Sequence, residues 1–129
     1  MVEEELTDGE RIARLLSSEV HGHERGVLRR LSVVDAADDV DPTEAGTFAY
    51  AVADDERRLA EVYAHPDRAH VEFLTAAQAA AEAGQRAGLR VRPKAVDPPR
   101  TLVFVENGAE VKPALRVVRA VGEALEESG

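Results

Sequence analysis

The stretch from Thr47 to Leu74 constrains the fold most, because its side chains alternate in character through three successive runs. In each run a large residue is followed by a small or charged one, which is the period of a half-buried β-strand. Two polar segments separate the runs, and the second contains Pro66-Asp67, a pair that suits a type I turn. The pattern therefore predicts an antiparallel meander with strands at 47–53, 58–64 and 69–74.

The short turns also predict which residues lie opposite one another. Across the first turn the expected pairs are Val52–Leu59, Tyr50–Glu61 and Phe48–Tyr63. Across the second they are Val62–Val71, Tyr63–His70 and Glu61–Glu72. Because side chains alternate between faces, this register gathers the aromatic residues on one face and leaves mostly alanine and valine on the other. The aromatic face needs a cover, which could be a helix, the sheet itself or a second subunit. We predict an interface formed by Phe48, Tyr50 and Tyr63.

Three helices are expected outside the meander. Thr7 with Glu10 three residues later is a capping box, which indicates that a helix begins near Asp8. The alanine-rich run after the meander has Thr75 as its expected N-cap and Gly88 as its stop. The predicted helices are 8–22, 75–87 and 111–127.

Further strands are expected at 27–34, 89–92 and 101–105. The last of these is apolar on both faces, which is typical of a strand inside the sheet. The resulting order is α-β-β-β-β-α-β-β-α. Runs of strands without strict alternation favour an α+β fold, with a single mainly antiparallel sheet of five to six strands and three helices.

The chain has 129 residues, which suits one domain spanning 1–129 with short disordered tails at 1–5 and 127–129. It contains no cysteine, so disulfides and thiolate metal sites are excluded. The first ten residues are acidic and lack an apolar run, so no signal peptide is expected. No stretch approaches the length of a membrane span.

The formal net charge is −9, from 25 acidic and 16 basic residues, and only Lys94 and Lys112 are lysines. This composition resembles that of cytoplasmic proteins from extreme halophiles, in which carboxylates keep the surface hydrated in molar salt. The resemblance implies a salt-adapted cytoplasmic protein. It also means that overall acidity says little about a partner.

Basic residues concentrate between Arg86 and Arg119, where the net charge is +5 against −14 elsewhere. Four of them surround a proline-rich loop and form a candidate site for a small anion or nucleotide: Arg90, Arg92, Lys94 and Arg100. The alternative is that these cations pair with carboxylates of the same chain or of a second copy. Nucleic acid is not favoured, because aromatic residues that could stack on bases are missing from the segment.

Three polar residues of the meander, Glu61, His70 and Glu72, are expected on one face. Two carboxylates and an imidazole could bind a divalent metal or act in acid–base chemistry. The alternative is a solvated or interface face with a different register.

The run that ends in His65-Pro66-Asp67, with Arg57, Arg58 and Tyr63 before it, resembles the motif of the J-domain co-chaperones. That resemblance implies a loop between two antiparallel helices. A tight β-turn built on Pro66 and Asp67 explains the same residues and agrees with the alternation on either side.

The sequence contains no nucleophile–base pair, phosphate loop or dinucleotide fingerprint, and no catalytic residue or cofactor is assigned. The preferred hypothesis is a small non-enzymatic binding module that acts as a homodimer. An anion-binding protein or enzyme that uses the basic segment is the alternative, and nucleic-acid contact ranks third.

Overall fold

A computed structural model describes residues 7–22, 30–54 and 57–128. Its helices are α1 (Gly9–Gly22), α2 (Ala77–Arg86) and α3 (Val111–Ser128), and a short 3-10 helix, η3 (Gly108–Glu110), precedes α3. Its strands are β1 (Ser32–Val34), β2 (Thr47–Ala53), β3 (Arg58–Ala64), β4 (Ala69–Phe73), β5 (Val91–Lys94) and β6 (Arg100–Val105). The predicted α+β fold and its order of elements are confirmed.

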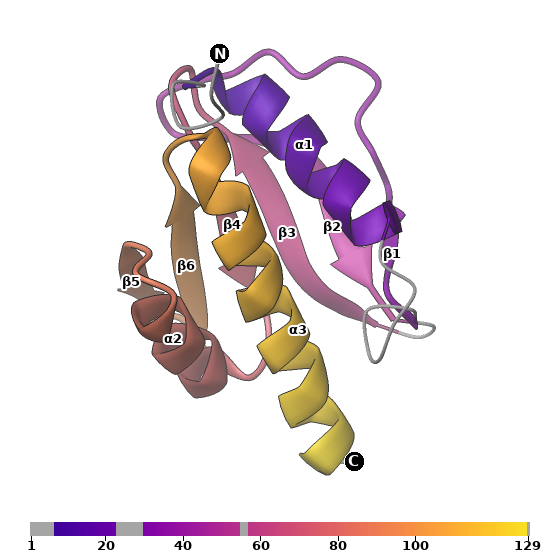
Figure 1. Ribbon diagram of the computed structural model, residues 1–129, viewed down its shortest axis with the longest axis vertical. Coiled ribbons are helices and arrows are strands. Elements are labelled where there is room, and N and C mark those ends of the chain that lie inside the picture. The colour runs from indigo at the N-terminus through magenta and orange to yellow at the C-terminus, as the bar shows by residue number, and fades with distance from the viewer. Residues whose placement is uncertain (1–6, 23–29, 55–56, 129) are drawn as a thin grey trace.

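All the strands belong to one antiparallel sheet in the order β1-β2-β3-β4-β6-β5. The three α-helices lie over one face of this sheet (Figure 1). α1 packs against β1, β3 and β4, α2 packs against β5 and β6, and α3 contacts both other helices. We call this side the helix face. The opposite side carries no helix in the described part of the chain, and we call it the open face.

The predicted meander is confirmed as β2, β3 and β4. All the pairs predicted between β3 and β4 are present: Val62–Val71, Tyr63–His70 and Glu61–Glu72. The turn is closed by a 2.8 Å hydrogen bond from the His65 N–H to the Arg68 carbonyl, so Pro66 and Asp67 occupy its centre. The expectation of two helices around this turn, taken from the J-domain resemblance, is therefore wrong.

A register shift between Phe48 and Tyr50 makes the predicted β2–β3 pairing wrong beyond Phe48–Tyr63. Tyr50 lies opposite Val62, not Glu61, because one extra residue in β2 forms an irregularity there. The shift turns Tyr50 to the helix face, where its hydroxyl donates a 2.6 Å hydrogen bond to the Ala13 carbonyl of α1. The side chain is buried, so the prediction that Tyr50 shares a face with Phe48 and Tyr63 is wrong.

The core lies between the helix face and the helices. Alternate residues of β3, β4 and β6 meet there in rows, such as Val62, Val71 and Val103, all buried. Burial of a side chain of this size contributes roughly 1.5–3 kcal/mol. Small residues bring the helices close to the sheet: a Cβ added at Gly84 of α2 would lie 2.6 Å from a Val91 methyl. The same alternation sends Glu61, His70 and Glu72 to the open face, while Thr101 of β6 points to the helix face and donates a hydrogen bond to the Ala77 carbonyl of α2.

Two helix starts differ from the predictions. Asp8, not Thr7, caps α1, because its Oδ1 accepts a 3.2 Å hydrogen bond from a backbone N–H of the first turn. Ala76 precedes α2 in a left-handed conformation, and no side chain caps that end, so Thr75 is not the N-cap. Aspartate and threonine are both good caps, so the local sequence does not choose between neighbours.

The remaining strands and tails also shifted. β1 covers only the end of the strand predicted at 27–34, and 27–29 lie outside the described residues. β5 begins two residues later than predicted and includes Pro93, which an edge strand tolerates. α3 continues to Ser128, while the tail predicted at 1–5 lies outside the described residues. Among the helices described, none is both long and apolar enough to cross a membrane.

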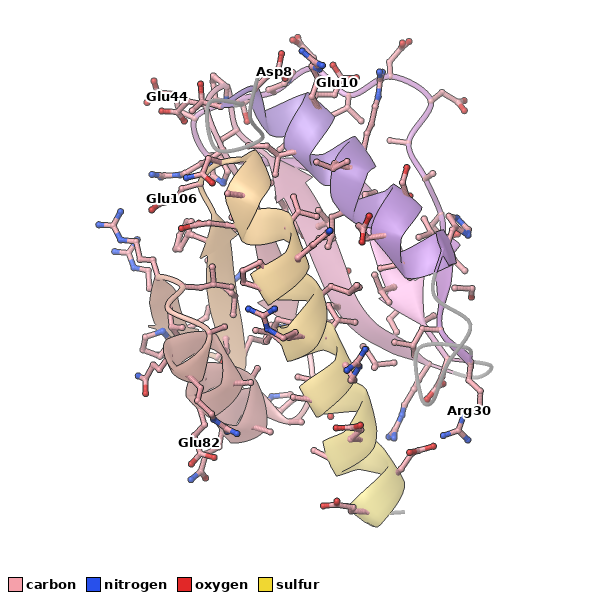
Figure 2. All side chains as sticks on the ribbon, in the orientation of Figure 1. Asp8, Glu10, Arg30, Glu44, Glu82 and Glu106 are labelled. Atoms are coloured by element: carbon pink, nitrogen blue, oxygen red, sulfur yellow. The ribbon has the colours of Figure 1, made fainter. Side chains whose placement is uncertain are left out.

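Charged side chains project around the rim of the molecule, including the exposed Glu44 and Glu82 (Figure 2). Some form exposed ion pairs, such as Arg30 with Glu126 of α3. Exposed pairs of this kind each contribute little to stability.

Candidate functional site

The open face carries a central row of three rings from neighbouring strands. Register places Tyr63 of β3, His70 of β4 and Phe104 of β6 side by side. The Tyr63 and His70 rings are stacked, with centroids 4.9 Å apart and planes 14° apart. Phe48 meets Tyr63 edge-on at 5.9 Å. These contacts are at the separations that favour aromatic pairs, so neighbouring rings stabilise one another.

His65 and His70 form a buried pair, each only 5% exposed. His65 Nδ1 lies 2.9 Å from the Glu44 carbonyl oxygen, which can only accept, so this nitrogen carries a proton. His65 Nε2 lies 2.8 Å from His70 Nδ1. In the neutral pair we assign the proton between them to His70, which then donates to His65. The two hydrogen bonds therefore connect the loop at Glu44 to the β3–β4 end of the sheet.

Gly46 closes over the same two rings. Its φ of 98° is in the left-handed region, and a Cβ added there would lie 3.1 Å from His65 Cε1 and 3.3 Å from His70 Cε1. Glycine is therefore required both by the backbone conformation and by the close approach of the loop to the imidazoles.

His70 Nε2 is left as a lone pair by this arrangement. The atom is closed to solvent, has no hydrogen-bond partner among the described residues, and lies 3.9 Å from Glu72 Oε1. Burial, together with neighbouring His65, lowers the pKa of His70 to about 4. The imidazole is therefore neutral at neutral pH. Since no solvent reaches Nε2, it is not placed to exchange protons with a bound substrate.

Glu72 is the buried anion of the open face, with 4% of its surface exposed. Its Oε2 accepts hydrogen bonds from Arg100 at 2.7 Å and from Lys94 at 3.1 Å. Burial alone would disfavour its charged form, but these two hydrogen bonds outweigh burial and lower the pKa of Glu72 below its usual value. The carboxylate is thus charged and held through its Oε2 atom.

Glu61 lies opposite Glu72 and is held by different partners. Its Oε1 accepts a 2.8 Å hydrogen bond from the Tyr63 hydroxyl, and its Oε2 accepts one of 2.9 Å from Arg58. Burial raises the pKa of Tyr63 to about 12, and the hydrogen bond to Glu61 adds to this shift. Separate cations thus neutralise the two facing glutamates, which would otherwise repel each other.

The structure brings the predicted trio of Glu61, His70 and Glu72 onto one face, but not into one site. Glu61 lies opposite Glu72, but only Glu72 comes within 4.0 Å of a His70 ring nitrogen, and each glutamate is paired with its own cations. Within 7–22, 30–54 and 57–128, no three acidic or histidine side chains are arranged to hold a metal ion. The contacts fit a structural polar network better than a catalytic centre.

Three of the four cations of the predicted anion site pair with two carboxylates of the same chain. Lys94 and Arg100 share Glu72, and Arg90 pairs with Glu106 at 3.3 Å, while Arg92 is exposed. This is the intrachain pairing that stood as the alternative. Anion binding at the cluster stays a prediction.

The residue that the sequence analysis missed is His65, which was interpreted only as part of a turn. A signal was available: Ala64 pairs with Ala69 at the end of the hairpin, and His65 and His70 are the residues that follow these two in the chain. Two side chains at the base of one tight turn are close in space. No feature of the sequence indicates that the Glu44 carbonyl accepts a hydrogen bond from His65.

A family model covers residues 1–129, the entire chain, and its description is a family of unknown function, DUF7993. The chain belongs to the DUF7993 family. No curated protein and no solved structure matches the DUF7993 chain. Its function must therefore be argued from its own surfaces.

Proposed function

We propose that this protein is a non-enzymatic interaction module that forms a homodimer through its open face. The observation that carries the proposal is that the helices all lie on the other face (Figure 1). Phe48, Tyr63 and Leu102 are left half-buried on a sheet surface that no described helix covers. Burial of such a surface against a partner is favourable.

The edges of the sheet favour association through the face. β1 is only three residues long, and β5 contains Pro93, which has no N–H to donate. Short strands and proline are common protections against edge-to-edge pairing. Strand pairing between two copies at either edge of the sheet is therefore disfavoured.

Charge supports a second copy as the occupant. The loop after β1 carries five carboxylates and no basic residue between Asp35 and Glu44, whereas β5, at the opposite edge, carries Arg92 and Lys94. A twofold axis parallel to the strands would place the acidic edge of one copy against the basic edge of the other. Such complementarity favours this orientation over the one that joins like edges.

The same acidic composition supports the further proposal of a salt-adapted cytoplasmic protein. For this reason the association is best measured in about 2 M potassium chloride, where the Debye length falls to about 3 Å or less and long-range repulsion is screened. Size-exclusion chromatography with light scattering should give twice the 13.9 kDa mass of one chain. A wild-type protein that stays monomeric throughout a concentration series would refute the proposal.

Substitutions test which face is used. Tyr63→Lys places a charge at the centre of the open face and should give a monomer with an unchanged circular dichroism spectrum. Arg92→Glu should weaken the dimer, because it reverses a charge on the basic edge. Arg116→Glu is the matched control, since Arg116 is also exposed but lies on α3, on the other side of the sheet. If Arg92→Glu and Arg116→Glu dimerise equally strongly, the proposed geometry is contradicted.

A further inference from the structure

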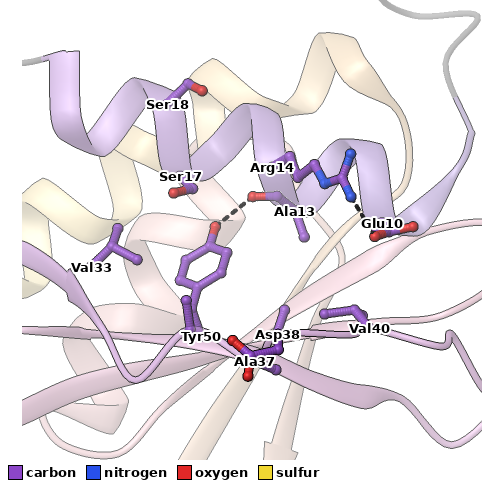
Figure 3. Close-up of a pocket in the computed structure, with 12 residues that line it drawn as sticks. Glu10, Ala13, Arg14, Ser17, Ser18, Val33, Ala37, Asp38, Val40 and Tyr50 are labelled. Carbon is purple, nitrogen blue, oxygen red and sulfur yellow. Dashed lines mark hydrogen bonds and ion pairs between the residues drawn. The ribbon is translucent and has the colours of Figure 1, made fainter.

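A pocket of about 370 Å³ lies between α1 and the loop that connects β1 to β2 (Figure 3). This volume is within the range of small-molecule sites in proteins, near its lower end. The pocket adjoins α1, on the helix side of the sheet, so it is separate from the open face. Binding in this pocket does not require the proposed homodimer, although its loop wall belongs to the acidic edge of the molecule.

Small side chains create the space. Ala13 on the helix, Ala37 on the loop and Ala49 on β2 leave room that larger residues would fill. Tyr50 stands between the two walls, and its 2.6 Å hydrogen bond to the Ala13 carbonyl fixes the helix relative to the strand. Val40 adds apolar surface on the loop side. The pocket is therefore built by the fold, and its wall combines small apolar side chains with polar ones, including Ser17 and Ser18 of α1.

The charged groups at the pocket are mainly acidic. Glu10 and Arg14, on successive turns of α1, form an ion pair at 2.8 Å. The Arg14 side chain is 74% exposed, but that of Glu10 is only 32% exposed, so the carboxylate is the more recessed partner. Asp38 lines the pocket from the loop; it is exposed at the pocket mouth and makes no hydrogen bond or ion pair to another described residue. The pocket thus holds two carboxylates and one largely solvated guanidinium.

We propose that this pocket binds a small organic cation, an ammonium group on a short apolar chain. The ammonium would lie between Glu10 and Asp38, and the chain would contact the alanines, Val40 and the Tyr50 ring. A solvent-accessible ion pair such as Glu10–Arg14 contributes little to stability, so a ligand can displace Arg14 at little cost. An aromatic ring beside the cation adds a favourable cation–π contact. A carboxylate ligand would instead meet two like charges.

Three probes with the same four-carbon chain separate the possible chemistries: butylammonium, butanol and butyrate. Each is added to the isotopically labelled full-length protein at constant ionic strength, and amide chemical shifts are followed by NMR. Butylammonium should cause saturable shifts in residues 10–18 and 36–50, butanol weaker ones, and butyrate none. Equal or stronger binding of butyrate would overturn the proposal, and so would shifts that do not saturate.

Two variants test the assignment within the pocket. Asp38→Asn keeps the side-chain shape and should weaken butylammonium binding about threefold to tenfold, since one charged contact is lost. Asp67→Asn, in the exposed β3–β4 turn, is the matched control and should bind like the wild type. Ala37→Leu should abolish binding by filling the space. Equal affinities of the wild type and Asp38→Asn would overturn the proposal.

Discussion

Replacement of Gly46 by alanine tests whether the loop before β2 is held against the histidine pair. Gly46 has a φ of 98°, and its added Cβ would lie 3.1–3.3 Å from atoms of His65 and His70. Gly88 is a matched control, because its φ is 78° but no atom lies within 4 Å of an added Cβ. Both variants suffer the backbone strain of a left-handed alanine, about 1–2 kcal/mol. Only Gly46→Ala also presses on buried rings.

The difference between the two variants measures the contact. Overpacking of a well-packed site costs about 1–3 kcal/mol, so Gly46→Ala should lose about 2 kcal/mol more than Gly88→Ala. For a chain of this length that corresponds to roughly 6–10 °C in the melting temperature. Urea unfolding in molar potassium chloride, followed by circular dichroism, gives both free energies of unfolding. Imidazole nitrogen shifts should also change in Gly46→Ala alone. Equal losses in the two variants would refute the reasoning.

Two further predictions concern stability. The pKa of His70 is about 4 in the fold and 6.5 when unfolded, so the unfolded chain binds more protons between these values. The neutral His70 therefore contributes to the free energy of unfolding fully above pH 6.5, and this contribution is lost as the pH falls toward 4. The loss amounts to roughly 3 kcal/mol. His70→Asn should flatten that part of the stability–pH curve measured by urea unfolding, and an unchanged slope would count against the buried pair. A Cβ at Gly9 would overlap the backbone oxygens of His65 and Arg68, whereas Gly22, at the other end of α1, faces open space. In the same assay Gly9→Ala should therefore lose about 3 kcal/mol of unfolding free energy, while Gly22→Ala should stay within about 0.5 kcal/mol of the wild type. Similar unfolding free energies for the two variants would show that the start of α1 does not pack against the β3–β4 turn.

The candidate site was predictable only in part. The β3–β4 turn length determines that Glu61 faces Glu72 and that Tyr63 faces His70, so their shared face could be read from the sequence. The cations that pair with Glu72 could not be predicted from the sequence, because Arg100 and Lys94 reach Glu72 only once β6 pairs with β4 and β5 pairs with β6. These contacts join residues far apart in the chain.

The sequence by itself determined the features that depend on neighbouring residues. The alternation and polar turns of 47–74 specify three strands, and the alanine run specifies a helix close to where α2 lies. The α+β class follows from the order of these elements. Each of these features is local, because side-chain period and turn chemistry act over a few residues.

Only the tertiary structure decided which side chains are buried together. Tyr50 leaves the predicted aromatic face because a single extra residue in β2 lets its hydroxyl reach the Ala13 carbonyl of α1. His65 pairs with His70 because Glu44, from a distant loop, fixes its proton. A one-residue shift costs little locally but reverses the face of a side chain, so packing between distant segments selects the register.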